Sequence, residues 1–136
     1  KFGPELGGLT VICVHTIRFP HSRAQFRQVT ALSKLIESLP GLKLVMGDFN
    51  ATPFSRIIDT IVSHSGLKRL TKLPSWPSTV GLPSAPMAEG TGLPQVAIDH
   101  IFVSPAIRAT QSQQIGQPSG SDHFPITMRL AIPLSP

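Results

Sequence analysis

Three short segments of this chain combine carboxylate, amide and imidazole groups that can support phosphate or metal chemistry. The first is Gly47-Asp48-Phe49-Asn50, which follows an apolar run and precedes the start of a helix. Gly47 permits a sharp turn, while Asp48 and Asn50 offer a carboxylate and an amide to a metal, a water or a phosphate oxygen. An Asx-turn leading into a helix explains the same residues without a function. The segment alone leaves both interpretations open.

The second segment is Asp99-His100, which interrupts the apolar run from Val96 to Val103. Alternation in a strand places the two side chains on opposite faces, and both faces look buried. A buried carboxylate is costly unless a cation or several donors satisfy it, so Asp99 needs a partner. A structural salt bridge with an arginine and a functional Asp–His pair are equal alternatives.

The third segment is Ser121-Asp122-His123-Phe124-Pro125, between a glycine-containing loop and the last apolar run. Neighbouring side chains cannot easily point the same way, so Asp99 could orient His123 while Asp122 remains free for a cation. An imidazole held by a carboxylate commonly serves as a base or phosphate ligand. The alternative is a surface loop with two solvated polar side chains.

Two further residues are weaker candidates. His15 ends the first apolar run, at the same kind of strand end as Asp48, although a lone histidine there is more often structural. Trp76 is the only tryptophan, and it is either a wall of a substrate site or a plug in the core.

The apolar pattern predicts mixed α and β elements around a sheet, with the polar candidates at strand ends, where open sheets tend to bind ligands. Ser22 and Gln25 fit a capping box at a helix start, and Thr52-Pro53 marks a second start. The predicted helices cover residues 22–39 and 52–65, and the predicted strands cover residues 9–14, 42–46, 95–104, 110–115 and 126–132.

Composition limits the class of protein. The chain has 136 residues, 40% of them hydrophobic and only 14% charged, which suits one packed domain or a large piece of one. The net charge of +5 favours an anionic partner such as a phosphate ester, nucleic acid or acidic membrane surface. The single cysteine, Cys13, excludes an intrachain disulfide and is expected to be buried. No apolar segment approaches the ~20 residues of a membrane span.

Together and in this order, the motifs resemble the endonuclease/exonuclease/phosphatase superfamily, whose members are deoxyribonuclease I-like. The Ile-Asp-His-Ile-Phe and Ser-Asp-His-Phe-Pro segments are the most diagnostic. The matching pieces are Val14-His15 with Pro20 downstream, Gly47-Asp48-Phe49-Asn50, Ser75-Trp76-Pro77-Ser78, Ile98-Asp99-His100-Ile101-Phe102, and Gly120-Ser121-Asp122-His123-Phe124-Pro125.

The resemblance implies roles that spacing alone does not supply. His123 would act on the attacking water or on the phosphate, with Asp99 orienting it. Asp48 and Asn50 would position the nucleophile and the phosphoryl oxygens, and Trp76 with Asn50 would contact the substrate. The implied reaction is in-line attack of water on a phosphodiester or phosphomonoester.

The resemblance also implies a divalent metal, Mg²⁺ or Mn²⁺, with Asp122 and Asp48 as ligands. His15 would serve as an acid or phosphate ligand. The implied partner is a phosphate-ester substrate: nucleic acid, a phospholipid head group or an inositol phosphate. Similar bacterial sequences often follow N-terminal membrane segments, so the resemblance implies a parent protein at the extracytoplasmic face of a bacterial membrane.

One departure from the family pattern is important. Members carry an asparagine and a glutamate metal ligand toward the N-terminus, and residues 1–10 supply no such pair. We therefore expect residues 1–136 to be the C-terminal part of one family domain whose N-terminal half is absent from this chain. The expected fold is α+β, with one mixed, mostly antiparallel sheet flanked by helices, half of a four-layer α/β/β/α sandwich.

This expectation has two consequences. The metal site would be incomplete and the fragment weakly active or inactive. An apolar sheet face would also be exposed, which is costly at about 25 cal/mol per Å² and favours a homodimer through that face.

Two other functions compete with a phosphoesterase. A non-catalytic module could bind phosphorylated ligands without hydrolysing them. A serine hydrolase could use Ser121, His123 and Asp99, although the chain lacks a Gly-x-Ser-x-Gly elbow and Ser121 is very near His123 in sequence. The sequence does not identify the substrate.

Overall fold

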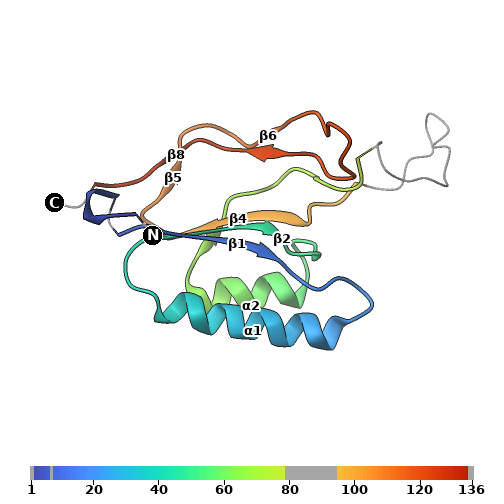
Figure 1. The fold of residues 1–136 in the computed structure, drawn as a ribbon, viewed down its shortest axis with the longest axis horizontal. Coiled ribbons are helices and arrows are strands. Elements are labelled where there is room, and N and C mark those ends of the chain that lie inside the picture. The colour runs from blue at the N-terminus through green and yellow to red at the C-terminus, as the bar shows by residue number, and fades with distance from the viewer. Residues whose placement is uncertain (1, 7, 79–94, 135–136) are drawn as a thin grey trace.

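A four-stranded mixed sheet forms the centre of the molecule, with helices on one face and a strand ribbon on the other (Figure 1). The computed structural model describes residues 2–6, 8–78 and 95–134. The strand order is β1-β2-β4-β3, with β1 parallel to β2 and the other pairs antiparallel. The elements are η1 (Pro4–Leu6), β1 (Thr10–His15), α1 (Ser22–Ser38), β2 (Lys43–Asp48), α2 (Arg56–Ser65), β3 (Lys68–Arg69), β4 (Asp99–Val103), β5 (Arg108–Ala109), β6 (Gln114–Ile115), β7 (Ile126–Thr127) and β8 (Leu130–Ala131). The predicted α+β class is confirmed.

Both helices bury part of the predicted apolar stripe, and α1 starts at the predicted residue, whereas α2 starts four residues later than predicted. α1 begins at Ser22 with His21 as its N-cap, and no side chain makes a capping hydrogen bond. The predicted capping box is wrong because Gln25 is buried and its amide bonds elsewhere. α2 begins at Arg56, where the Ser55 side chain accepts from the backbone N–H of Ile58.

The C-terminal strands do not join the central sheet. β5 pairs with β8 and β6 with β7, and these pairs form a ribbon over the sheet face opposite the helices (Figure 1). Of the predicted strand 110–115 only Gln114–Ile115 form a strand, and the preceding Gln113 side-chain oxygen accepts from the backbone N–H groups of Lys72 and Leu73. Such a long-range contact leaves no trace in the local pattern.

One predicted strand is shorter in the structure, and Cys13, which was expected to be buried, is not. β4 begins at Asp99, because residues 95–98 contribute only an isolated bridge between Val96 and Trp76. Cys13 is exposed, since β1 is an edge strand of the sheet. Within the described ranges, no helix is long and apolar enough to cross a bilayer.

Alternation along β4 divides its residues between two cores. His100 and Phe102 face the helices, where their rings and that of Phe49 contact one another edge-on or tilted. Ile101 and Val103 belong to a second apolar cluster on the opposite face, completed by residues of the ribbon such as Leu130. Asp99, the first residue of β4, therefore starts on the ribbon side of the sheet, as the period predicts.

His100 is the one imidazole in the core. It is 1% exposed, and its two nitrogens lie 2.9 Å from the Ala51 carbonyl oxygen and 3.1 Å from Thr71 Oγ1. Burial lowers the pKa of His100 below its ordinary value, and Arg69 lowers it further, while the Ala51 carbonyl and Asp99 oppose the shift. The folded state therefore favours the neutral ring.

This lowered pKa predicts acid sensitivity. A depressed histidine pKa stabilises the fold above the unfolded-state pKa of about 6.5, and this contribution falls as the pH drops through the folded-state pKa. We expect the free energy of unfolding to decrease below about pH 6.5, by at most ~1.4 kcal/mol per pH unit from this group. Urea denaturation at several pH values measures the slope. The His100→Gln variant should be less stable overall but lose this part of the slope, and an unchanged slope contradicts the assignment.

Candidate active site

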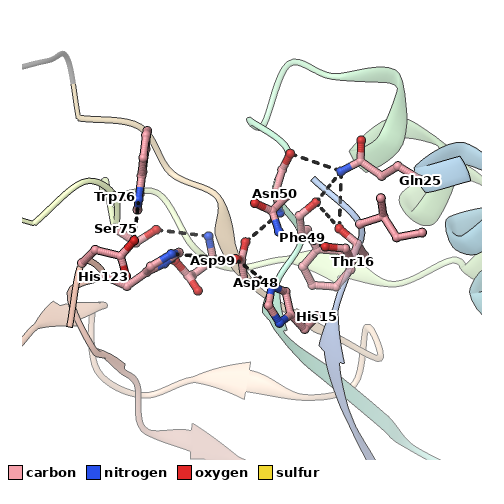
Figure 2. A network of polar contacts seen from close by, with 12 residues as sticks. His15, Thr16, Gln25, Asp48, Phe49, Asn50, Ser75, Trp76, Asp99 and His123 are labelled. Carbon is pink, nitrogen blue, oxygen red and sulfur yellow. Dashed lines mark hydrogen bonds and ion pairs between the residues drawn. The ribbon is translucent and has the colours of Figure 1, made fainter. Parts of the chain in front are cut away.

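The ends of three adjacent strands bring His15, Asp48 and Asp99 side by side. In the sheet register, His15 is paired with Asp48 across β1 and β2, and Asp48 with Asp99 across β2 and β4. Figure 2 shows these residues converging from separate elements on one point. The convergence follows from topology: the carboxyl ends of the parallel strands β1 and β2 meet the amino end of the antiparallel strand β4 at the same edge.

His123 reaches this edge from the loop before β7 and lies between the two carboxylates. Its Nδ1 is 2.7 Å from Asp99 Oδ2, and its Nε2 is 3.8 Å from Asp48 Oδ2. An ionised carboxylate only accepts, so Nδ1–H donates to Asp99 and the neutral ring presents Nε2 as an acceptor. Asp99 thus fixes the tautomer and leaves a basic nitrogen facing Asp48.

Asp48 is the carboxylate most affected by its surroundings. Burial raises the pKa of Asp48 above its ordinary value and the Asp99 carboxylate raises it further, whereas the Asn50 backbone N–H and the imidazoles of His123 and His15 lower it. His15 Nε2 is 3.6 Å from Asp48 Oδ2, and the His15 side chain is 78% exposed. His15 therefore stands at the solvent-facing rim of the group.

The end of β2 and the turn that follows it each need a particular type of residue. Gly47 has a φ of 141°, and a Cβ there would lie 1.9 Å from the Val14 carbonyl oxygen. Only glycine lets β1 approach β2 this closely. Asn50 adopts a left-handed φ of 45°, its N–H donates to Asp48 Oδ1 at 2.7 Å, and its side-chain amide donates to the Thr16 carbonyl at 2.9 Å.

A clamp that the sequence does not reveal holds this turn from the helix side. The Gln25 side-chain amide of α1 donates to the carbonyl oxygens of Phe49 at 2.9 Å and Asn50 at 3.2 Å. The Thr16 hydroxyl also donates to the Phe49 carbonyl, and the Thr16 N–H donates to the Asp48 carbonyl at 2.9 Å (Figure 2). Gln25 and Thr16 are both buried, so the turn is fixed without water.

The segment 75–78 fastens the loop that carries His123. The Ser78 N–H donates to the Asp122 carbonyl at 2.7 Å, and the Phe124 N–H donates to the Ser75 carbonyl at 2.8 Å. The buried Ser75 hydroxyl accepts from the Asp99 N–H at 3.1 Å. Ser75 therefore contacts Asp99 directly and also Phe124, the residue that follows His123. Its place in the Ser-Trp-Pro-Ser motif is the only sequence signal for this role.

A hollow of about 710 Å³ opens in front of these groups. All seven predicted site residues line it: His15, Asp48, Asn50, Trp76, Asp99, Asp122 and His123. Trp76 is half-buried at the wall of the hollow, and its indole N–H donates to Asp122 Oδ2 at 3.4 Å. The Asp122 carboxylate thus contacts the Trp76 indole.

The described residues do not form a metal site by themselves. In those ranges, no three His, Cys, Asp or Glu side chains form a group that could hold a metal ion. Asp48 also already accepts from the Asn50 N–H, and Asp122 accepts from Trp76. Asp48 and Asp122 could supply at most part of the six oxygen ligands of Mg²⁺, which commonly takes several of them from water and phosphate.

Comparison with known protein families identifies this arrangement. The sequence profile of the endonuclease/exonuclease/phosphatase family matches residues 2–123, which is most of the chain. The chain belongs to this family. The name of the family refers to endonucleases, exonucleases and phosphatases, which are hydrolytic enzymes. No curated protein matches the chain.

Several solved structures share the fold at low sequence identity. TDP2 from D. rerio, complexed with a single-stranded DNA product, is 14% identical with a TM-score of 0.67 over 90% of this chain and 56% of its own. A mannosyl-6-phosphatase from Bacteroides thetaiotaomicron is 18% identical with a TM-score of 0.58 over 90% of this chain and 51% of its own. A beta toxin from Staphylococcus aureus with bound magnesium ions is 14% identical with a TM-score of 0.56 over 87% of this chain and 51% of its own. This chain therefore spans about half the length of each of these three proteins.

The clamp on the turn after β2 can be tested through stability. Gln25→Ala leaves the buried carbonyl oxygens of Phe49 and Asn50 short of a donor, which we expect to cost about 1–3 kcal/mol. Urea denaturation measures the loss. Gln28→Ala is the matched control on the same helix: it removes two exposed contacts, from the Ile17 N–H and to the His15 carbonyl, which water can replace, so we expect no more than about 1 kcal/mol. Equal effects of the two substitutions would refute a clamp.

Proposed function

We propose that this chain carries the acid–base half of a divalent-metal-dependent phosphoesterase, which hydrolyses a phosphodiester or phosphomonoester by in-line attack of water. The observation that supports it is the His123 imidazole, held by Asp99 at 2.7 Å with its other nitrogen toward Asp48 and the open hollow. An oriented imidazole beside a substrate-sized hollow suits proton transfer in a hydrolytic reaction.

Each residue has a distinct part in the proposed reaction. His123 Nε2 accepts a proton from the attacking water or donates a hydrogen bond to the phosphoryl group, and Asp99 stabilises the imidazolium that forms. Asp48 and Asn50 position the water and the phosphoryl oxygens. His15, at the exposed rim, protonates the leaving group or binds the phosphate. Trp76 forms the wall against which the substrate rests.

Metal dependence is part of this proposal, although the described residues do not fit a complete metal site. The magnesium-bound toxin structure supports a divalent ion in a protein of the same fold. We propose that Asp48 and Asp122 contribute to binding Mg²⁺ or Mn²⁺ and that the remaining ligands come from the other half of the family domain. For the chain by itself, this predicts weak metal binding and weak hydrolysis.

Hydrolysis of bis-(p-nitrophenyl) phosphate in Mg²⁺ or Mn²⁺ tests the catalytic assignment. Removing a positioned base costs roughly 10²- to 10⁴-fold in rate, so His123→Ala should lower hydrolysis toward the uncatalysed level. Asp48→Asn should also reduce it, because the carboxylate facing Nε2 is lost. EDTA should abolish the activity of the unmodified chain.

Matched controls lie on α2, away from the hollow. His64 and Asp59 are exposed there, so His64→Ala and Asp59→Asn change the same residue types without touching the site. Their rates should equal that of the unmodified chain. If His123→Ala and Asp48→Asn also leave the rate unchanged, the catalytic proposal is wrong.

A non-catalytic phosphate-binding module is the second candidate. It is favoured by the absence of a three-ligand metal group among the described residues. It predicts that inorganic phosphate binds to the chain, that His123→Ala weakens this binding, and that no phosphate ester turns over. Isothermal titration together with the hydrolysis assay separates the two candidates.

The geometry gives no support to a serine hydrolase. Ser121 Oγ accepts from the His123 backbone N–H at 3.1 Å, while both ring nitrogens of His123 face carboxylates. An attacking hydroxyl would need to donate to the ring. Location at an extracytoplasmic membrane face stays a prediction.

We also propose that the chain self-associates through the ribbon side of the sheet. A hollow of about 570 Å³ remains there between sheet and ribbon, and its walls include Met46, Ile101 and Ile126. Burying such apolar surface is favourable at about 25 cal/mol per Å², so a second copy that covers it is stabilised. Sedimentation at micromolar concentrations should detect a dimer, and Ile101→Lys should shift it to monomer. A strictly monomeric unmodified chain contradicts this proposal.

A further inference from the structure

A second hollow lies beside the candidate active site, and the proposed reaction does not use it. Its volume is about 470 Å³, and it lies between the N-terminal ends of α1 and α2. Phe19 and Asn50 line both this hollow and the one in front of His123. A ligand bound at His123 can therefore extend past Asn50 into the second hollow.

Exposed aromatic rings surround this second hollow. Phe19 is 81% exposed and Phe26 is 41% exposed, and both line it. Phe54, which is 95% exposed, lies in the short segment between two further lining residues, Thr52 and Ser55. Water contact with three phenylalanine rings is unfavourable, and such a group of exposed apolar side chains indicates a binding surface.

The charge in the lining of the second hollow is positive. Arg56 lines it, whereas Arg18 lines the adjoining hollow in front of His123 together with Asp48, Asp99 and Asp122. Among the described residues that line the second hollow, none is acidic. The ligand that fits is therefore anionic and carries a flat apolar group.

We propose that the second hollow binds the nucleotide next to the scissile phosphate of a single-stranded nucleic acid. The base stacks on Phe19 and Phe26, and the guanidinium of Arg56 pairs with the neighbouring phosphate. This deepens the proposed function and rests on it for the place of the scissile phosphate. Stacking on aromatic rings combined with cationic contacts to the backbone is how single strands are bound without sequence preference.

The shape of the surface favours a strand over a membrane. Two of the three rings line a concave space that adjoins the candidate active site. A bilayer is broad, and it is contacted by protruding side chains, whereas a flexible strand can follow a groove from one hollow to the next. Membrane binding is therefore the alternative outcome of the test.

Fluorescence anisotropy in EDTA tests this inference without any hydrolysis. The probes are a labelled twelve-nucleotide oligothymidylate and an abasic oligonucleotide of the same length, which has the same phosphates but no bases. The unmodified chain should bind oligothymidylate more tightly than the abasic strand. Phe19→Ala and Phe26→Ala should each weaken oligothymidylate binding roughly 5- to 100-fold and leave abasic binding unchanged.

Three controls separate the contributions. Arg56→Ala should weaken the binding of both probes and reduce its dependence on salt. Leu35→Ala, at an exposed apolar position farther along α1, should change neither. His123→Ala should retain the preference for bases, so failure of the hydrolysis assay and failure of this inference give different results.

Two results would overturn the inference. One is equal affinity for the oligothymidylate and the abasic strand, including no binding of either. The other is binding to phosphatidylglycerol vesicles that requires Phe19 and Phe54 while the oligothymidylate affinity of the same variants is unchanged, which would assign the surface to a membrane. Oligouridylate tested beside oligothymidylate shows whether the sugar matters, and a preference for either supports the inference.

Discussion

Asp48 and Asp99 face each other across β2 and β4. The other groups of the site must stabilise two carboxylates held this close together. Carboxylates directly opposite repel, and partial burial adds a desolvation cost that raises the pKa of Asp48. The His123 imidazole donates to Asp99 from Nδ1, and its electrostatic effect on Asp48 opposes the rise in the pKa of that carboxyl. The loop that carries His123 is held by hydrogen bonds between Ser75 or Ser78 and residues 121–124.

The parts of the site that sequence could predict are those that depend on local periods. A period of two along β4 separates Asp99 from His100, and the structure has these side chains on opposite sides, with His100 in the helix-side core. Apolar runs that stop at His15 and Asp48 indicate strand ends, and parallel strands necessarily bring their carboxyl ends to one edge. The α+β class follows from the same pattern.

The parts that sequence could not predict depend on distant partners. Gln25 fits a capping box locally, but burial against the turn after β2 gives its amide better acceptors than the helix end. Gln113 lies outside β6, where its side chain accepts from the backbone N–H groups of Lys72 and Leu73. The amino end of β4 is shortened in a comparable way, since Val96 pairs with Trp76 in place of a sheet neighbour. In each case a tertiary contact outweighs a local preference that is worth about 1 kcal/mol.

Orientation of the imidazole and ligation of a metal are separable in this fold. Asp99 contacts His123 directly, while the Ser75 hydroxyl accepts from the Asp99 N–H and the Asn50 N–H donates to Asp48. The same described residues supply no three-ligand metal group. The His123–Asp99 pair is therefore assembled by the packing of β2 and β4 with the segment at 75–78, and it does not depend on a metal group among the described residues. Because a positioned imidazole and a metal stabilise different charges in phosphoryl transfer, the proposed recognition of a phosphate ester does not depend on the proposed metal.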